Sequence, residues 1–210
     1  SARGLHLRAE AVRYGFQDRL TWLGDPECVE APWDALASPE YGAAVGAGVR
    51  PRGPRSTKPA PNPWLVPTKG LRARPPAGSA GTGGDCTTHI GTVDRHRNLV
   101  SLTHTAVSLF GSRVVVPGTG ILLSNGMLWF DPEPGKPNSI APGKRALVNM
   151  VPVLAFRRSE PYLTLGAPGG RKIISAIPQV LSSLVDMRLG PQAAIDAPRL
   201  HTEGGDLWVD

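Results

Sequence analysis

Residues 51–84 contain eight prolines and six glycines, and this segment restricts the possible folds of the chain. It also holds six basic residues and no acidic ones, which matches the net charge of +6 of the whole chain. Proline removes a backbone donor and glycine adds conformational freedom, so this composition is typical of a solvated linker. The sequence therefore predicts a helical region at 1–50, a flexible linker at 51–86 and a second folded region at 87–210.

The basic tract raises the alternative of a binding protein whose partner is a polyanion. Nucleic-acid-binding segments normally add a recognisable fold or stacking aromatic residues, and Trp64 is the one aromatic residue in the tract. We therefore expect no nucleic-acid partner. No run of 18 apolar residues is present, so we expect no membrane span. Cys28 and Cys86 are too few for a four-ligand zinc site unless several histidines converge on them, and we expect no metal.

Hydrophobic spacing predicts helices before the linker and hairpins followed by helices after it. Apolar side chains in residues 5–24 recur at three- and four-residue intervals, as on one face of a helix. Residues 32–49 predict one helix or two short ones, with Ser38-Pro39 as a start signal. The later elements are a hairpin of 88–93 and 99–105, short strands at 114–116 and 120–123, a hairpin of 151–156 and 162–165, a helix at 171–187 with Pro178 as a kink, and a helix from 191. This order predicts an α+β layered domain.

A glycine-rich turn, "LGAPGGRKII", joins a predicted strand to a predicted helix. It fails the phosphate-loop pattern, because Arg171 stands where the second glycine is required and Ile173 where the hydroxyl is required. Two interpretations remain. The turn is either a tight strand-to-helix connection, or a nest in which the N–H groups of Gly169 and Gly170 bind an oxyanion.

"TTHIGTVD" begins where the linker meets the first predicted strand. An internal threonine hydroxyl is a poor nucleophile, because no base is attached to it. If the chain were cut before Thr87, the freed α-amine would have an ordinary pKa of about 7.7–8.0 and could act as that base. The alternative is that Thr87 and Thr88 are ordinary β-branched strand residues.

From Thr87 onward the chain resembles the small subunit of the gamma-glutamyltranspeptidase family of N-terminal-nucleophile hydrolases. Five ordered blocks carry the resemblance: "TTHIGTVDRHRNLVSLTHT", "FGSRVVVPGTGILLSN", "PNSIAPGKRALVNMVPVL", "LGAPGGRKIISAIPQVL" and "AAIDAPRLH". The upstream stretch "EAVRYGFQDRLTWLGDPECVEAPWDALASPEY" is similar to the end of the family's large subunit. The resemblance implies part of an αββα layered sandwich, incomplete as a stand-alone chain, so we expect a fragment whose partner is the missing large-subunit segment.

The resemblance also implies roles for particular residues. Thr87 matches the nucleophile, released by self-cleavage of the Cys86–Thr87 bond, and its own amine is the base. Thr105 matches the threonine that orients the nucleophile, and Gly169 with Gly170 matches the oxyanion hole. The implied reaction transfers an acyl group from a small-molecule or peptide donor to water or an amino-acid acceptor. It needs no metal or organic cofactor.

The chain departs from the family pattern where glutathione-cleaving members contact the γ-glutamyl group. Val107 stands in place of an asparagine, Gly126 in place of a glutamine or glutamate, and Trp129 in place of an aspartate. Val148 and Asn149 replace paired serines. A desolvated zwitterion needs hydrogen-bonding and charged partners. Three hypotheses therefore stay open: a γ-glutamyltransferase or glutathione hydrolase, an acylase of the same family with another acyl donor, and an inactive fragment.

Overall fold

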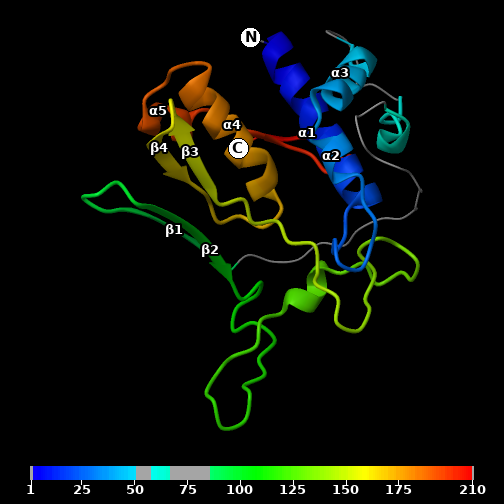
Figure 1. Cartoon of the computed structure of the whole chain (residues 1–210), viewed down its shortest axis with the longest axis vertical. Coiled ribbons are helices and arrows are strands. Elements are labelled where there is room, and N and C mark those ends of the chain that lie inside the picture. The colour runs from blue at the N-terminus through cyan, green and yellow to red at the C-terminus, as the bar shows by residue number, and fades with distance from the viewer. Residues whose placement is uncertain (1, 51–57, 67–85, 210) are drawn as a thin grey trace. The chain divides into compact units, whose positions relative to one another are not determined.

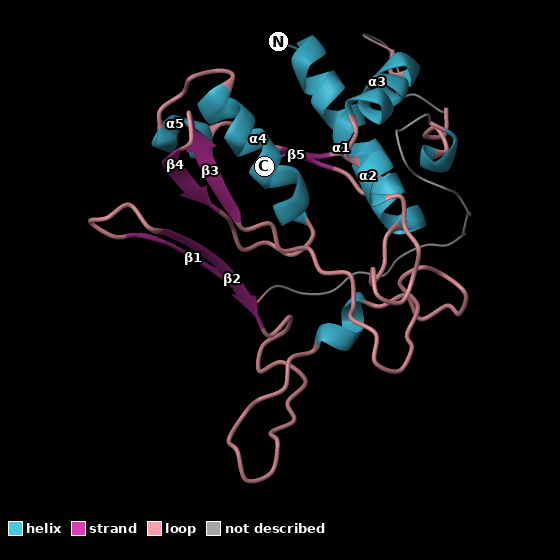
Figure 2. Ribbon diagram, in the orientation of Figure 1, coloured by secondary structure: helices cyan, strands magenta, loops and turns pink. Residues whose placement is uncertain are grey.

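The computed structural model describes residues 2–50, 58–66 and 86–209, which form a mixture of helices and strands (Figures 1 and 2). The chain divides into two compact units, one of Ser1–Gly81, Phe130–Leu147 and Leu200–Asp210, the other of Thr82–Trp129 and Val148–Arg199. The elements are α1 (Ala2–Trp22), α2 (Trp33–Leu36), α3 (Pro39–Gly48), η1 (Pro63–Leu65), β1 (Thr87–Val93), β2 (Leu99–Thr105), η2 (Gly126–Trp129), β3 (Val153–Arg157), β4 (Glu160–Leu165), α4 (Lys172–Val185), α5 (Pro191–Asp196), β5 (Leu200–His201) and β6 (Trp208–Val209). The predicted α+β character is confirmed.

The first unit is built around α1. Its buried Phe16 ring meets the ring of His201 in β5 edge-on, with the centroids 5.3 Å apart. Ser38 caps α3, as the sequence predicts, since its hydroxyl accepts a hydrogen bond from Tyr41 N at 3.0 Å. The Tyr41 hydroxyl reaches back to α1 and donates to Asp18 Oδ1 at 2.8 Å. Burial raises the pKa of Asp18 to about 6, while the hydrogen bond from Tyr41 opposes that rise.

Part of the proline-rich tract packs on these helices. The Lys58 carbonyl oxygen accepts a hydrogen bond from the Tyr14 hydroxyl at 3.1 Å. The Pro61 carbonyl oxygen lies 3.2 Å from the Tyr41 hydroxyl, whose one proton is directed to Asp18. The Pro63 side chain is fully buried in η1. Residues 51–57 and 67–85, the remainder of the predicted linker before Cys86, lie outside the described residues.

The second unit contains two antiparallel hairpins, β1–β2 and β3–β4 (Figure 1). The turn between β1 and β2 is held by Asp94, whose Oδ1 accepts hydrogen bonds from His96 N at 2.8 Å and Asn98 N at 2.9 Å. Asn98 Nδ2 also donates to Asp94 Oδ2 at 2.7 Å, and this side-chain bond, followed by the backbone bonds, lowers the pKa of Asp94. Because turn geometry sets hairpin register, this turn places Thr87 opposite Thr105.

The β1–β2 hairpin also contacts β4. Ser101 donates to Leu165 O at 3.2 Å, and Thr164 donates to Val100 O at 3.2 Å. These bonds join the first hairpin to the strand that leads into the glycine-rich turn. Hydrogen bonds from side chains to backbone carbonyls therefore connect the β1–β2 hairpin, which carries Thr87 and Thr105, with the strand before the glycine-rich turn.

The expected helices of this unit are present. Helix α4 continues through Pro178, and its buried residues Ile173, Ile177 and Val180 recur at helical spacing. Helix α5 begins with Pro191 in its first turn, where a missing N–H removes no helical hydrogen bond.

One local expectation differs from the structure, and one strand pair was not predicted. Residues 114–116 and 120–123 form an isolated bridge between Val115 and Leu122 and no extended strands. The tight turn leaves room for few ladder bonds, and the apolar side chains of both segments are largely exposed. The β5–β6 pair was not predicted, because two-residue strands are too short to show alternation.

Candidate active site

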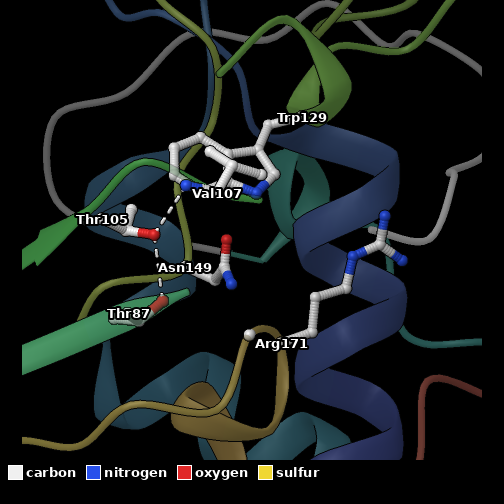
Figure 3. A pocket seen from close by; sticks show the side chains of 7 residues that line it. Thr87, Thr105, Val107, Trp129, Asn149 and Arg171 are labelled. Atoms are coloured by element: carbon white, nitrogen blue, oxygen red, sulfur yellow. Dashed lines mark hydrogen bonds between the residues drawn. The ribbon is translucent and has the colours of Figure 1, made fainter. Parts of the chain in front are cut away.

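The predicted nucleophile and its partner meet at the open end of the β1–β2 hairpin (Figure 3). Thr87 is the first residue of β1 and Thr105 the last residue of β2, and they face each other in register. The two hydroxyl oxygens are 3.1 Å apart, with Thr87 as the donor. Residues 18 positions apart in sequence therefore form a hydrogen-bonded pair.

The Thr105 hydroxyl is the centre of a short hydrogen-bonded chain. It donates to the carbonyl oxygen of Cys86 at 2.8 Å and accepts from Val107 N at 2.8 Å. A hydroxyl has one proton to donate, so the Thr87 hydroxyl must donate to Thr105. The carbonyl that precedes Thr87 is thus hydrogen-bonded to the same group that holds the Thr87 hydroxyl.

The glycine-rich turn runs from the end of β4 to the start of α4. Gly169 and Gly170 have φ angles of 131° and 55°, in the region that favours glycine. Their carbonyl oxygens accept hydrogen bonds from Lys172 N at 3.1 Å and Ile173 N at 3.3 Å, so the turn is fixed to the first turn of the helix. Among the described residues, neither glycine N–H donates a hydrogen bond to another protein group.

A small pocket brings the hydroxyl pair and the turn together. Its lining residues are Thr87, Thr105, Val107, Trp129, Asn149, Gly170 and Arg171. The structure thus gathers most of the predicted site residues, from segments up to 84 positions apart in the sequence, around Thr87. In the described part of the chain, Gly126 and Val148 do not line this pocket: Gly126 begins η2, and the Val148 side chain is exposed. Cys86 and Gly169 are also outside the lining, and each directly precedes a lining residue, Thr87 and Gly170 respectively.

The pocket has a mixed lining, in which Val107 and Trp129 are the two large apolar side chains. Val107 is 2 % exposed, and it lines the pocket together with Trp129 (Figure 3). The Arg171 side chain extends away from the two threonines (Figure 3). Asn149 is 4 % exposed, and its Oδ1 is buried with no hydrogen-bond partner among the described residues. The pocket therefore offers one unused acceptor, Asn149 Oδ1, together with the hydroxyl pair of Thr87 and Thr105.

Val107 has a strained backbone, with φ at 73°. A β-branched residue in the left-handed region is an outlier that costs about 1–3 kcal/mol, whereas asparagine adopts that region several times more often. The strain lies at a pocket wall and is held in place by the bond from Val107 N to Thr105 Oγ1. The backbone at this position is better suited to the asparagine that the resemblance expects there than to valine.

Arg171 is the one lining residue that the sequence did not predict. Its position directly after Gly169 and Gly170 was the sequence feature that could have indicated it as a lining residue. In the described ranges, no group of three or more histidine, cysteine, aspartate or glutamate residues could hold a metal ion. None of the helices within those ranges is long and apolar enough to cross a membrane.

Comparison with known proteins identifies related enzymes. The family model described as gamma-glutamyltranspeptidase matches residues 1–209. The Acylase ACY 1 proenzyme of Pseudomonas sp. (strain SE83) is 37% identical over 210 residues, which is 100% of this chain and 34% of that protein. The glutathione hydrolase proenzyme of Escherichia coli (strain K12) is 32% identical over 211 residues, which covers 96% of this chain and 34% of that protein. The chain spans about a third of the length of these relatives.

A solved structure has a similar fold over the whole chain. Cephalosporin acylase from Bacillus halodurans superposes with a TM-score of 0.78 at 27% sequence identity. The match covers 100% of this chain and 34% of the acylase chain. Both kinds of enzyme, glutathione hydrolase and acylase, are therefore among the relatives.

Proposed function

The chain belongs to the gamma-glutamyltranspeptidase family, and from this premise we propose that it carries the catalytic threonine of an acyl-transferring enzyme. The reaction is γ-glutamyl transfer or glutathione-type hydrolysis through an ester on Thr87. The hydrogen-bonded chain from the Thr87 hydroxyl through Thr105 to the Cys86 carbonyl supports this proposal. The finer fold is the αββα sandwich of N-terminal-nucleophile hydrolases, completed by segments outside this chain.

The first step is self-cleavage before Thr87. Thr87 Oγ1 attacks the Cys86 carbonyl carbon, its proton passes to Thr105 Oγ1, and Thr105 gives its own proton to the carbonyl oxygen. Collapse of the adduct breaks the C–N bond, moves that proton to the Thr87 nitrogen and leaves Cys86 as an ester on Thr87. Water then hydrolyses the ester, which frees the Cys86 carboxylate and the Thr87 amine.

The freed amine is the base for substrate turnover. It takes the Thr87 hydroxyl proton as Oγ1 attacks the substrate amide, and the oxyanion accepts hydrogen bonds from the N–H groups of Gly169 and Gly170. The proton then passes to the leaving amine, and an acyl ester remains on Thr87. Water or the amine of an acceptor attacks this ester and regenerates the enzyme.

A second candidate is an acylase that cleaves amides whose acyl group lacks an α-amino and α-carboxylate pair. The observation that favours it is the pocket wall, where the buried Val107 and the half-buried Trp129 stand at positions expected to contact a γ-glutamyl group. A charged head loses its hydration on entry and finds no charge partner on these two side chains. A flatter, more apolar acyl group has no such cost.

The mechanism is tested by Thr87→Ala in the purified protein. We expect the native protein to show a new N-terminus at Thr87 by mass spectrometry and Thr87→Ala to remain uncut. The adjacent, exposed Thr88→Val is the control and should be cut like the native protein. An active enzyme with an intact Cys86–Thr87 bond would rule out the mechanism.

The acyl donor is tested with two p-nitroanilides, γ-glutamyl and phenylacetyl, which share a leaving group. A higher kcat/KM for the γ-glutamyl compound supports the first candidate, and a higher value for the phenylacetyl compound supports the acylase. Trp129→Asp should shift this ratio toward γ-glutamyl by about tenfold or more, since it restores a charge partner. Met127→Asp, an exposed position in the same 3-10 helix η2, should leave the ratio unchanged.

A further inference from the structure

His89 lies on the same face of the β1–β2 hairpin as the proposed nucleophile. Strand residues alternate between faces, so Thr87, His89 and Gly91 share one side of β1. His89 Nδ1 lies 3.0 Å from Thr103 Oγ1, on the residue opposite in register. The inward face thus continues from the Thr87–Thr105 pair to a histidine–threonine pair.

The second ring nitrogen of His89 has no role in the proposed chemistry. His89 Nε2 is buried and has no hydrogen-bond partner among the described residues. A buried polar atom without a partner costs about 1–3 kcal/mol. The position of the ring therefore calls for an explanation other than hydrogen bonding at Nε2.

The ring occupies the space where residue 166 would carry a side chain. A Cβ built on Gly166 would lie 2.1 Å from His89 Cε1 and 2.2 Å from His89 Nδ1. A similar close approach occurs at Gly91, where a Cβ would lie 3.0 Å from a Thr164 methyl carbon. Glycine on one side and an imidazole on the other thus set the spacing between β1 and the end of β4.

This contact lies between the two halves of the proposed catalytic machinery. On one side, His89 is two strand residues from Thr87, about 7 Å along β1. On the other, Gly166 opens the turn that ends in Gly169 and Gly170 and is fixed to α4 by backbone hydrogen bonds. A change in the spacing at residue 166 would therefore move the oxyanion-hole donors relative to the nucleophile.

We propose that His89 is a positioning residue: its ring, packed against Gly166, sets the distance between Thr87 and the N–H groups of Gly169 and Gly170. This inference rests on the proposed function. Self-cleavage depends instead on Thr87, Thr105 and Cys86, all at the end of the β1–β2 hairpin. The His89–Gly166 contact thus governs acyl transfer and leaves self-cleavage nearly unaffected.

The test is a double-mutant cycle on the processed protein with His89→Asn, Gly166→Ala and the double variant. Asparagine keeps a polar group for Thr103 and removes the ring atoms that face Gly166. The Gly166→Ala methyl must move by about 1.3 Å to reach a 3.4 Å contact with the ring, and a 1 Å misplacement in an active site costs about 10²-fold in rate. We expect each single variant to lose about 10²-fold in kcat, with KM within about threefold.

The double variant should lose about 10²-fold, not the roughly 10⁴-fold that independent effects would give, because the alanine methyl fills space left by the ring. His104→Asn, an exposed histidine on the outer face of the same hairpin, is the matched control and should retain full kcat. Self-cleavage of His89→Asn should stay within about threefold of native.

Three outcomes would overturn the inference: multiplicative losses in the double variant, native kcat in His89→Asn, or failure of His89→Asn to self-cleave. The last outcome also covers a variant that does not fold. A native protein that neither self-cleaves nor turns over amides would instead refute the proposed function. The two failures are thus distinguishable.

Discussion

Thr105→Val is the substitution that tests the self-cleavage geometry most directly. Valine keeps the shape of threonine and replaces its hydroxyl with a methyl group. The change removes the donor to the Cys86 carbonyl, the acceptor for the Thr87 hydroxyl and the acceptor for Val107 N, at 2.8, 3.1 and 2.8 Å respectively. We therefore expect self-cleavage, and not only stability, to be affected.

The size of the effect follows from these three contacts. Loss of a donor to a carbonyl that develops negative charge costs about 10²–10³-fold in rate. The orphaned N–H of Val107, which is 2 % exposed, should cost roughly 1–3 kcal/mol of stability in addition. Thr105→Ser keeps the hydroxyl, so its rate should stay within about tenfold of the native rate, since only a methyl group is removed.

The assay follows newly made protein with time and measures the fraction cut before Thr87 by intact mass. Thermal unfolding of each variant is recorded in parallel, so that a folding defect can be separated from a slow reaction. Thr88→Val is the matched control, because its side chain lies on the exposed face of β1. Self-cleavage of a folded Thr105→Val within threefold of the native rate would refute the reasoning.

Three further predictions follow from single residues. Val107→Asn should stabilise the protein by about 1 kcal/mol, because asparagine adopts the left-handed φ more readily. It should also shift the ratio of kcat/KM for the γ-glutamyl and phenylacetyl compounds about tenfold toward γ-glutamyl. Phe110 also has a positive φ but is exposed, so Phe110→Asn should raise the melting temperature without changing this ratio. In urea titrations, Asp18→Asn should raise the free energy of unfolding by about 2–3 kcal/mol at pH 7–8 and not at pH 4. The buried Asp18 carboxyl has a pKa of about 6, so between about pH 4 and pH 6 it stays protonated in the folded state and ionises in the unfolded state. The stability that Asp18 contributes is therefore full below about pH 4 and is lost as the pH rises through 6. The kcat/KM of the processed enzyme should rise with pH through about 7–8 as the Thr87 amine loses its proton, and a profile flat from pH 6 to 9 would contradict that assignment.

The local sequence pattern was sufficient to predict those helices and strands that depend on residues close to one another in the sequence. Alternation and β-branched residues predict β1 and β2, and the spacing of Ile173 and Ile177 predicts α4. Composition alone was less informative in the proline-rich tract, because the burial of Pro63 depends on how that tract packs on the helices of the first unit. A solvated linker and a packed proline segment have the same composition.

The pocket could not be predicted from local pattern, since its walls come from segments far apart in the sequence. Position-by-position resemblance nevertheless indicated Val107, Trp129 and Asn149, and the structure places all three around Thr87. The left-handed backbone of Val107 could not be read from the sequence, because valine disfavours that conformation. The orphaned Oδ1 of Asn149 likewise requires knowledge of the packing around it.

The proposed mechanism imposes an order on the two reactions. Before cleavage Thr87 has no amine, and the proton route runs through Thr105 to the Cys86 carbonyl. Cleavage consumes that carbonyl as an acceptor and creates the base that the second reaction needs. In the proposed mechanism Thr105 carries protons during self-cleavage and orients the Thr87 hydroxyl during turnover. The His89–Gly166 contact matters once a substrate oxyanion must meet Gly169 and Gly170. Variants at Thr105 should slow both reactions, and variants at the contact should slow the second alone. Rate measurements that show this difference between the two groups of variants would support the proposal that Thr87 is the nucleophile in both reactions.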